Sequence, residues 1–88
     1  MLEEARKILR LSSTTFDIEI TGLINACKRD LELAGVNISD EADPLIRRSI
    51  LTYVKAYFGT NDLNDRFLRD YAMLKLQLRD SGDYRVGI

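Results

Sequence analysis

The sequence contains no histidine and only one cysteine in 88 residues. Without histidine, the chain lacks the commonest metal ligand and the usual acid–base group at neutral pH. A single cysteine allows no disulfide within the chain. These absences remove most hydrolase, transferase and metal-site templates, and no convergent acid, base and nucleophile indicate an enzyme. We therefore predict a protein with no catalytic residue, no cofactor and no metal site.

The chain also lacks an excess of charge of one sign and any long apolar run. Thirteen Lys and Arg residues stand against 14 Asp and Glu residues, which gives a formal net charge of -1. A near-neutral chain has no global basic field to collect nucleic acid by counterion release, and this disfavours a stand-alone DNA-binding role. No segment has the length and apolar character of a membrane span or of a secretory leader. We expect a soluble intracellular protein with no membrane partner.

The composition that remains is that of an ordinary globular domain. The hydrophobic fraction is 45% and the charged fraction is 31%, both usual for soluble proteins. A chain of this size buries roughly 64% of its extended-chain surface on folding, which is enough for one modest core. Its stability is expected to be marginal unless neighbouring molecules contribute.

Residues 43–58 have the features of one complete helix. Asp43 suits the N-cap, Pro44 suits the first helical position, and Gly59 suits the left-handed residue that ends a helix. Two neighbouring apolar rows run along the segment: Ile46, Ile50, Tyr53 and Tyr57 form one, and Leu51, Val54 and Phe58 form the other. A helix with so much apolar surface must be covered on more than one side. We therefore predict that it is the central helix of a small bundle.

Two helices are predicted before this central one from apolar residues at helical spacing. The first covers roughly residues 2–11. The second covers roughly residues 15–34 and follows a polar turn in which Thr14 and Asp17 have the spacing of a capping box. Gly35 is expected to end it.

A fourth helix is predicted over residues 62–80, with Asp62 as its N-cap. Acid-before-base pairs four residues apart, Asp62 with Arg66 and Asp65 with Arg69, favour a helix here. The predicted fold is all-α: a small bundle of four helices around the third. We divide the chain into a helical domain, residues 1–82, and a non-helical C-terminal tail, residues 83–88.

Gly22 and two arginines are candidate contacts between subunits. Gly22 lies inside the second predicted helix, where glycine costs roughly 1 kcal/mol relative to alanine. Such a residue often marks the close approach of another backbone, from the same chain as our first expectation or from a neighbouring subunit. Arg47 and Arg48 lie in the first turn of the central helix, where the helix dipole disfavours positive charge. Either nearby acidic residues (Asp40, Glu41 and Asp43) compensate them, or an arginine reaches an acidic group on another subunit.

Three other side chains favour a structural interpretation. Cys27 lies in the apolar stripe of the second predicted helix, without the basic neighbour and solvent access that a reactive thiol needs. Tyr53 and Tyr57 follow the helical period, so we interpret them as core or helix-packing residues and not as stacking surfaces for a ligand.

The C-terminal tail has an alternating pattern. Tyr84, Val86 and Ile88 alternate with Arg85 and Gly87, as in an extended segment that could add to the surface or sheet of a partner. The alternative is a frayed terminus.

The order of these features resembles the small helical head-to-tail connector, or DNA-packaging adaptor, proteins of tailed bacteriophages. The similarity runs over most of the chain and rests on order, spacing and length. The strings that carry it are Ile8-Leu9-Arg10-Leu11, Asp17-Ile18-Glu19-Ile20, Leu23-Ile24-Asn25-Ala26-Cys27, the proline-started helix Pro44 to Phe58 with its ending Tyr57-Phe58-Gly59, and Tyr71-Ala72-Met73-Leu74-Lys75-Leu76-Gln77-Leu78 with Tyr84 beyond it.

The resemblance implies a structural protein of the virion neck that is assembled in the host cytoplasm. It implies a homo-oligomeric ring that docks beneath the phage portal protein, binds a neck or tail-completion protein on its other side, and lets DNA pass without sequence-specific binding. Gly22, Arg47 and Arg48 are then candidates for contact between subunits. The candidates for contact with the portal are Tyr84, Arg85, Val86 and Ile88.

A small helix-turn-helix DNA-binding regulator is the alternative interpretation, because a turn between helices near Gly35 or Gly59 could form that motif. Such a regulator needs a basic recognition helix. The fourth predicted helix instead balances Arg66 and Arg69 with Asp65 and Asp70.

Overall fold

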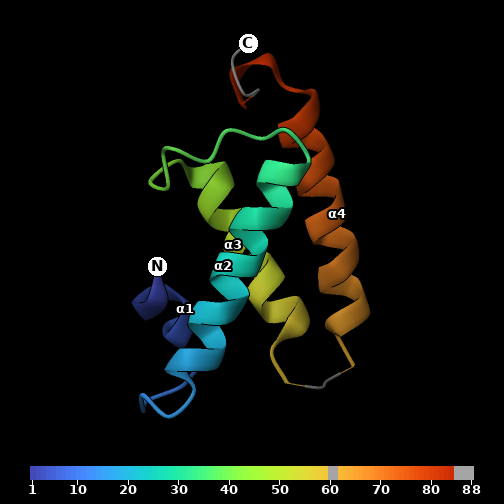
Figure 1. Cartoon of the computed structure of the whole chain (residues 1–88). Coiled ribbons are helices and arrows are strands. Elements are labelled where there is room, and N and C mark those ends of the chain that lie inside the picture. The colour runs from blue at the N-terminus through green and yellow to red at the C-terminus, as the bar shows by residue number, and fades with distance from the viewer. Residues whose placement is uncertain (60–61, 85–88) are drawn as a thin grey trace.

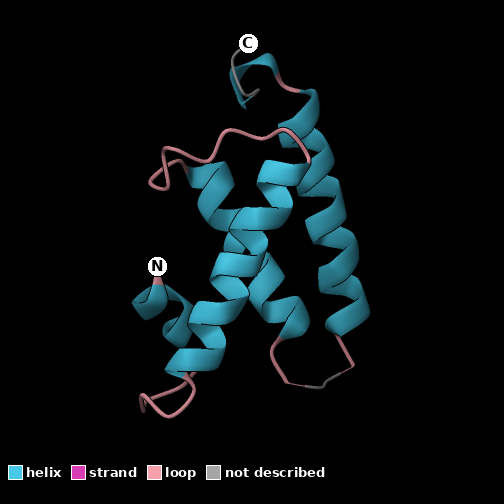
Figure 2. Cartoon of the chain, in the orientation of Figure 1, coloured by secondary structure: helices cyan, strands magenta, loops and turns pink. Residues whose placement is uncertain are grey.

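The computed structural model describes residues 1–59 and 62–84. Over these residues the chain forms the helices α1 (Leu2–Ile8), α2 (Asp17–Leu33), α3 (Pro44–Tyr57) and α4 (Asn64–Asp80), followed by the 3-10 turn η1 (Gly82–Tyr84) (Figure 1). Figure 2 shows these helices joined by loops along the described part of the chain. The prediction of an all-α fold is confirmed.

Helix α3 is the central element, as predicted. It packs against α1, α2 and α4. Its start is fixed by the Asp43 carboxylate, which accepts hydrogen bonds from the backbone N–H groups of Leu45 (2.9 Å) and Ile46 (3.3 Å). Its end is marked by Gly59 at φ 67°, a backbone conformation that glycine adopts without strain. The predicted ends are therefore correct to within one residue.

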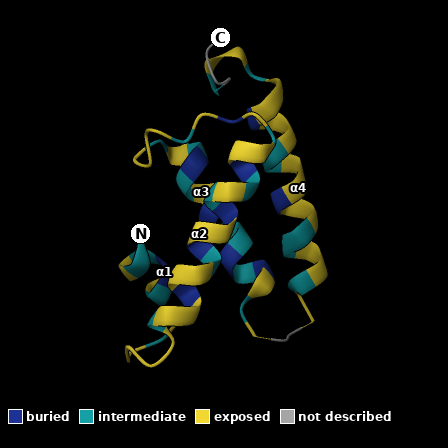
Figure 3. Ribbon diagram, viewed as in Figure 1, coloured by how far each residue is buried: buried dark blue, intermediate teal, exposed yellow. Residues whose placement is uncertain are grey.

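The core is built from one face of each helix together with one loop residue. Figure 3 shows the buried positions of the helices turned toward one another. The buried cluster consists of Ala5 of α1, Ile20, Ile24, Cys27 and Leu31 of α2, Val36 of the following loop, Ile46, Ile50 and Val54 of α3, and Tyr71 and Leu78 of α4. Each fully buried aliphatic side chain of this kind contributes about 1.5–3 kcal/mol relative to exposure. Burial at α3 therefore holds the bundle together.

Helix α1 is shorter than predicted. It ends at Ile8, and Arg10 has a left-handed backbone with φ 58°. The N–H groups of Arg10 and Leu11 then bond back to the carbonyls of Lys7 (3.1 Å) and Arg6 (2.9 Å), which closes the helix. The predicted end at residue 11 is wrong because an arginine takes the position that glycine usually occupies.

The start of α2 also differs from the prediction. No side chain caps this helix, whose N-cap is Phe16, so the capping box of Thr14 and Asp17 is wrong. The Asp17 carboxylate instead accepts two hydrogen bonds from the Arg6 guanidinium, at 2.7 and 2.8 Å. The Asp17 carboxylate is therefore bound by Arg6 of α1 and does not cap its own helix.

Helix α4 begins at Asn64, two residues after the predicted start, and its N-cap is Leu63. The Asn64 side-chain amide donates to the Ala56 carbonyl at 2.7 Å and thereby joins the start of α4 to the end of α3. The ion pairs predicted within this helix do not form. Among residues 1–59 and 62–84, no ion pair within 4.0 Å joins Asp62 with Arg66 or Asp65 with Arg69.

The chain beyond α4 is only partly described. We predicted an extended segment that includes Tyr84, but Gly82–Tyr84 form a 3-10 turn. Residues 85–88 of the predicted tail lie outside the described residues. The tyrosine hydroxyl of Tyr84 lies 3.0 and 2.9 Å from the two carboxylate oxygens of Asp43, so this turn is attached to the start of α3.

Three aspartates thus join peripheral elements to the two helices at the centre. Asp17 joins α1 to α2, Asp43 joins η1 to α3, and Asp30 joins α4 to α2. At Asp30, one carboxylate oxygen accepts the Tyr71 hydroxyl at 2.6 Å and the Lys75 ammonium at 3.0 Å. Such charge-assisted hydrogen bonds are short and directional, so they fix where each element sits.

Cys27 lies beside the Asp30 cluster and is structural, as predicted. Its Sγ is 3.7 Å from the Tyr71 hydroxyl oxygen, and its side chain is fully buried. Burial raises the pKa of this thiol to about 12, so it stays neutral at physiological pH.

The tyrosines of α3 divide into one packed and one exposed residue. Tyr53 packs edge-on against the Tyr71 ring, with ring centres 5.0 Å apart. Tyr57 packs against the Tyr53 ring, with ring centres 4.5 Å apart, but is half exposed, so of the two predicted roles it has that of a packing residue and not that of a core residue. The helical period continues through Tyr57, but the other helices do not extend far enough to bury this side chain.

The substitution Tyr71→Phe tests the Asp30 cluster. It removes the donor to a partly buried carboxylate and should lower the free energy of unfolding by about 1–3 kcal/mol. The measurement is urea denaturation. Tyr53→Phe is the matched control, because the Tyr53 hydroxyl takes part in no hydrogen bond among the described residues. Equal losses in both variants would contradict the assignment.

All three aspartates have pKa values below the ordinary range. Hydrogen bonding from Arg6 lowers the pKa of Asp17. Burial alone would raise the pKa values of Asp30 and Asp43. Hydrogen bonds outweigh this effect and lower both pKa values, through tyrosine and lysine at Asp30 and through tyrosine and backbone N–H groups at Asp43. Each carboxylate is therefore stabilised in its charged form by folding.

Acid should consequently unfold the protein. A group whose pKa is lower in the folded state contributes stability above its unfolded pKa, about 3.9 for aspartate, and loses it as the pH falls through the folded value. We expect the free energy of unfolding, measured by urea denaturation at a series of pH values, to fall below about pH 4. The variant Asp17→Asn should show a shallower fall. Stability that held or rose between pH 5 and pH 2 would refute this account.

Candidate assembly surfaces

The outer face of α2 carries apolar surface that the chain itself does not cover. Ile18 is 91% exposed and Leu33, at the other end of the helix, is 70% exposed. Scattered exposed apolar residues are normal on a protein surface. An isoleucine that is almost completely in water is nevertheless poorly placed in an isolated subunit.

Gly22 lies on this same face, one helical turn after Ile18. A Cβ atom added to Gly22 would meet nothing within 4 Å. Among the residues that the structure describes, no other backbone approaches this glycine, contrary to our first expectation. We define the α2 outer face as the exposed residues Ile18, Glu19, Gly22, Asn25 and Arg29.

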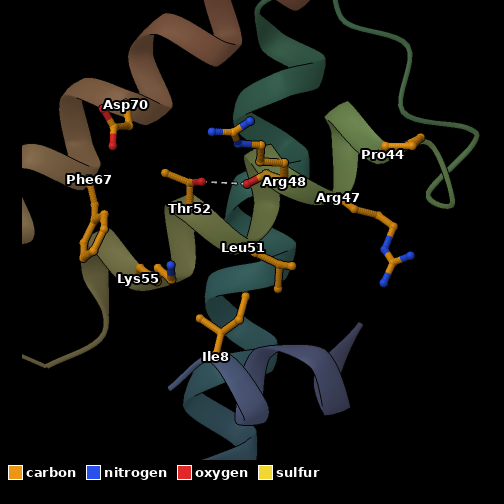
Figure 4. A pocket seen from close by; sticks show the side chains of 9 residues that line it. All are labelled: Ile8, Pro44, Arg47, Arg48, Leu51, Thr52, Lys55, Phe67 and Asp70. Carbon is orange, nitrogen blue, oxygen red and sulfur yellow. Dashed lines mark hydrogen bonds between the residues drawn. The ribbon is translucent and has the colours of Figure 1, made fainter. Parts of the chain in front are cut away.

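A second candidate surface is a groove beside α3, which we call the α3 groove (Figure 4). It has a volume of about 430 Å³ and lies between the end of α1, the outer side of α3 and the first half of α4. The residues that line it are Ile8, Pro44, Arg47, Arg48, Leu51, Thr52, Lys55, Phe67 and Asp70. The groove thus combines apolar side chains with three cations and one carboxylate.

The two arginines of α3 have different surroundings. Figure 4 shows their side chains pointing to opposite sides of the helix. Arg47 forms an ion pair with Glu4 of α1 at 3.4 Å, within the same chain. Arg48 is exposed and, within the described part of the chain, has no acidic partner within 4.0 Å. Of the two, Arg48 is the one whose charge is left open to another molecule.

Acidic residues near the start of α3 do not compensate these arginines by direct pairing. Glu41 pairs with Lys28 of α2, and the Asp43 carboxylate is occupied by Tyr84 and the helix N-terminus. An Asp40 carboxylate oxygen accepts the backbone N–H of Ala42 at 3.1 Å. The expected compensation by Asp40, Glu41 and Asp43 therefore does not take the form of ion pairs, and in the described residues Glu4 is the one acidic side chain within 4.0 Å of either arginine.

Lys55 and Phe67 mark the middle of a longer depression. The Lys55 ammonium lies 5.2 Å from the centre of the Phe67 ring, a cation–π contact. Both residues also line an adjoining hollow that reaches Arg10 and Leu63. Cations from the turn after α1 and from α3 therefore follow one another along this side of the subunit.

The candidate portal contacts are described only at Tyr84. Besides its hydrogen bonds to Asp43, its backbone carbonyl accepts the N–H of Asn37 at 2.6 Å. Hydrogen bonding to the Asp43 carboxylate raises the pKa of Tyr84, which stays neutral. The other candidates, Arg85, Val86 and Ile88, lie outside the described residues.

The described residues show neither a metal site nor a membrane-spanning helix. Among them, no group of three or more cysteine and acidic side chains is placed to hold a metal ion. A search of the same residues for membrane-spanning helices found none with the required length and apolar character. What the geometry provides is surface for contact with other macromolecules.

Comparison with known families gives a match to the chain. A family model described as phage connector protein matches residues 1–85 of the chain. No curated protein and no solved structure matches it.

The substitution Gly22→Ala tests whether this glycine serves the isolated subunit. Because the added methyl group meets open space, we expect the free energy of unfolding to rise by up to about 1 kcal/mol from the better helix propensity of alanine. The matched control is Gly35→Ala, where φ is 86° and alanine should destabilise the fold. Thermal or urea denaturation measures both. A destabilised Gly22→Ala variant would show that the glycine is needed within the subunit.

Proposed function

The chain belongs to the phage connector protein family, and from that premise we propose that it forms a homo-oligomeric ring that joins the portal to the next neck protein. The family match, which covers nearly the whole chain, is the observation that carries this proposal. The family is a structural one, so the role in the virion neck is to bind neighbouring proteins and to transform none.

Two surfaces of different chemistry support ring formation. The α2 outer face presents Ile18 and Gly22 among polar and charged side chains, and the α3 groove is lined by cations and apolar side chains. A ring requires a heterologous contact, in which two different patches of the same subunit meet on neighbouring copies. A small domain with uncovered apolar surface also gains stability from such contacts. Gly22, Arg47 and Arg48 are our candidates for this interface.

Portal attachment is proposed for the C-terminal end. Tyr84 holds η1 against Asp43 and Asn37, so residues beyond it start from a fixed point on the subunit. We assign Tyr84, Arg85, Val86 and Ile88 as the portal contact. A neck or tail-completion protein would bind the opposite side of the ring.

The central channel of such a ring must let DNA pass without gripping it. A formal net charge of -1 gives many copies of the subunit without a strong basic field. The helix-turn-helix alternative gains no support at either turn. Residues 34–43 separate α2 from α3 and residues 58–63 separate α3 from α4, whereas that motif uses a turn of three or four residues.

Mixing experiments with portal rings test this function. We expect the full chain to co-sediment with portal rings and to form closed rings by negative-stain electron microscopy. Removal of residues 85–88 should abolish co-sedimentation and leave helical content, measured by circular dichroism, unchanged. Truncation after Tyr84 keeps the hydrogen bonds to Asp43, so the truncated chain should fold like the full chain, and a loss of co-sedimentation would reflect the missing residues. A truncated chain that still co-sediments would refute the portal assignment.

A further inference from the structure

The α3 groove has the chemistry of a receptor for an apolar side chain that lies next to a carboxylate. Its apolar lining comes from Ile8, Leu51 and Phe67. Arg48 and Lys55 also line the groove. In the described part of the chain, Arg48 has no acidic partner within 4.0 Å. An occupant with both an apolar and an anionic group would satisfy both parts of the groove.

A phosphate backbone fits the groove less well. Asp70 lies on its rim among the cations and would repel a polyanion. The apolar lining offers nothing to a phosphate, and the chain as a whole carries a formal net charge of -1. Charge and shape therefore favour a protein segment over a nucleic acid.

The chain itself carries a segment that complements the groove. Of its exposed apolar side chains, Ile18 is the most exposed, at 91%, and it is followed by Glu19. Glu19 is exposed and, among residues 1–59 and 62–84, has no cation within 4.0 Å. Because Ile18 is in water, it does not occupy the groove of its own chain.

In the described part of the chain, five of the other exposed apolar residues lack a free carboxylate beside them, and the sixth, Leu63, lines the hollow that adjoins the groove together with its neighbour Asp62. Asp17, which follows Phe16, is paired with Arg6. Glu32, which precedes Leu33, lies 3.8 Å from Arg29. Tyr57, Met73 and Leu76 have no acidic neighbour in the sequence.

We infer that the α3 groove of one copy receives the Ile18–Glu19 end of α2 from the next copy. This inference rests on the proposed ring and deepens it. Ile18 enters the apolar lining of the groove, and the Glu19 carboxylate meets Arg48 and Lys55. Gly22, one turn along the same helix, leaves room for the neighbouring backbone to approach. Each subunit offers one groove and one α2 end, so the contact repeats from copy to copy.

Charge reversal tests the pairing of Glu19 with Arg48. We expect Arg48→Glu and Glu19→Arg each to weaken self-association by about tenfold or more, because like charges then face each other across the interface. In an alternating mixture of the two variants, the exchanged charges face each other at one contact and the native Glu19 and Arg48 face each other at the next. The double variant has the exchanged charges at every contact. Both the mixture and the double variant should therefore recover most of the association. Arg69→Glu is the matched control: Arg69 is exposed on α4 and does not line the groove. Mass measurement over a concentration series gives the association constants, and circular dichroism checks the fold.

Cysteine cross-linking tests the position of Ile18. An Ile18→Cys chain mixed with a Leu51→Cys chain should give a disulfide-linked pair containing one chain of each kind. Leu33→Cys replaces Ile18→Cys in the control, since Leu33 is exposed at the other end of α2. The native Cys27 does not interfere, because it is fully buried and burial raises its pKa to about 12.

The outcomes separate this inference from the proposed function. The inference is wrong if rings form normally with Arg48→Glu, or if rings form but the Ile18→Cys and Leu51→Cys chains do not cross-link. Either result leaves the proposed ring itself unaffected. Specific cross-linking without rings or portal binding supports the inference and refutes the proposed function. Copies that never associate, with or without portal, refute both. Salt-sensitive binding of duplex DNA that Arg48→Glu abolishes would make nucleic acid the occupant and overturn the inference.

Discussion

The structure depends on one constraint, which is that α3 cannot be left in water. Ile46, Ile50 and Val54 are almost completely buried along one stripe of the helix, and Ser49 and Ala56 are buried beside this stripe. Three helices are needed to cover them, and the hydrophobic effect supplies the driving force without specifying direction. The cover is incomplete at one place. Because α1 ends at Ile8, the side of α3 from Arg48 to Lys55 stays open between α1 and α4, and the groove is the result.

Direction is supplied by the three aspartates. Burial alone would let α1, α4 and η1 slide on the surface of the central pair, since many packings remove similar apolar area from water. A carboxylate that accepts two hydrogen bonds at 2.6–3.0 Å has far fewer acceptable geometries. Asp43 has two functions, because it begins α3 and also receives η1. The C-terminal end of the described chain is therefore attached to the helix around which everything else is arranged.

The sequence predicted best where local chemistry decides the structure. The ends of α3 were correct because Asp43, Pro44 and Gly59 act through neighbours in the chain. The sequence predicted poorly where residues far apart in the chain determine the structure. Asp17 has the spacing of a cap but binds Arg6, and nothing local indicates that Arg10 adopts a left-handed backbone. The α3 groove depends on how three helices pack, so no single segment of the sequence could reveal it. Gly22 showed its energetic cost in the sequence, but only the empty space around it excluded a partner in the same chain.

Several features of the subunit are unfavourable in isolation and share one explanation. Gly22 costs roughly 1 kcal/mol in the middle of a helix, and Arg48 faces an unfavourable helix dipole near the start of α3. Ile18 is exposed to water. A small domain has a small free energy of unfolding, so we expect it to keep residues that are unfavourable in the isolated subunit only where they form contacts in an assembled state. Membership of the connector family supplies that state, because a connector works only in contact with other proteins. The unfavourable residues lie on two separate surfaces, which is the arrangement that the proposed ring requires.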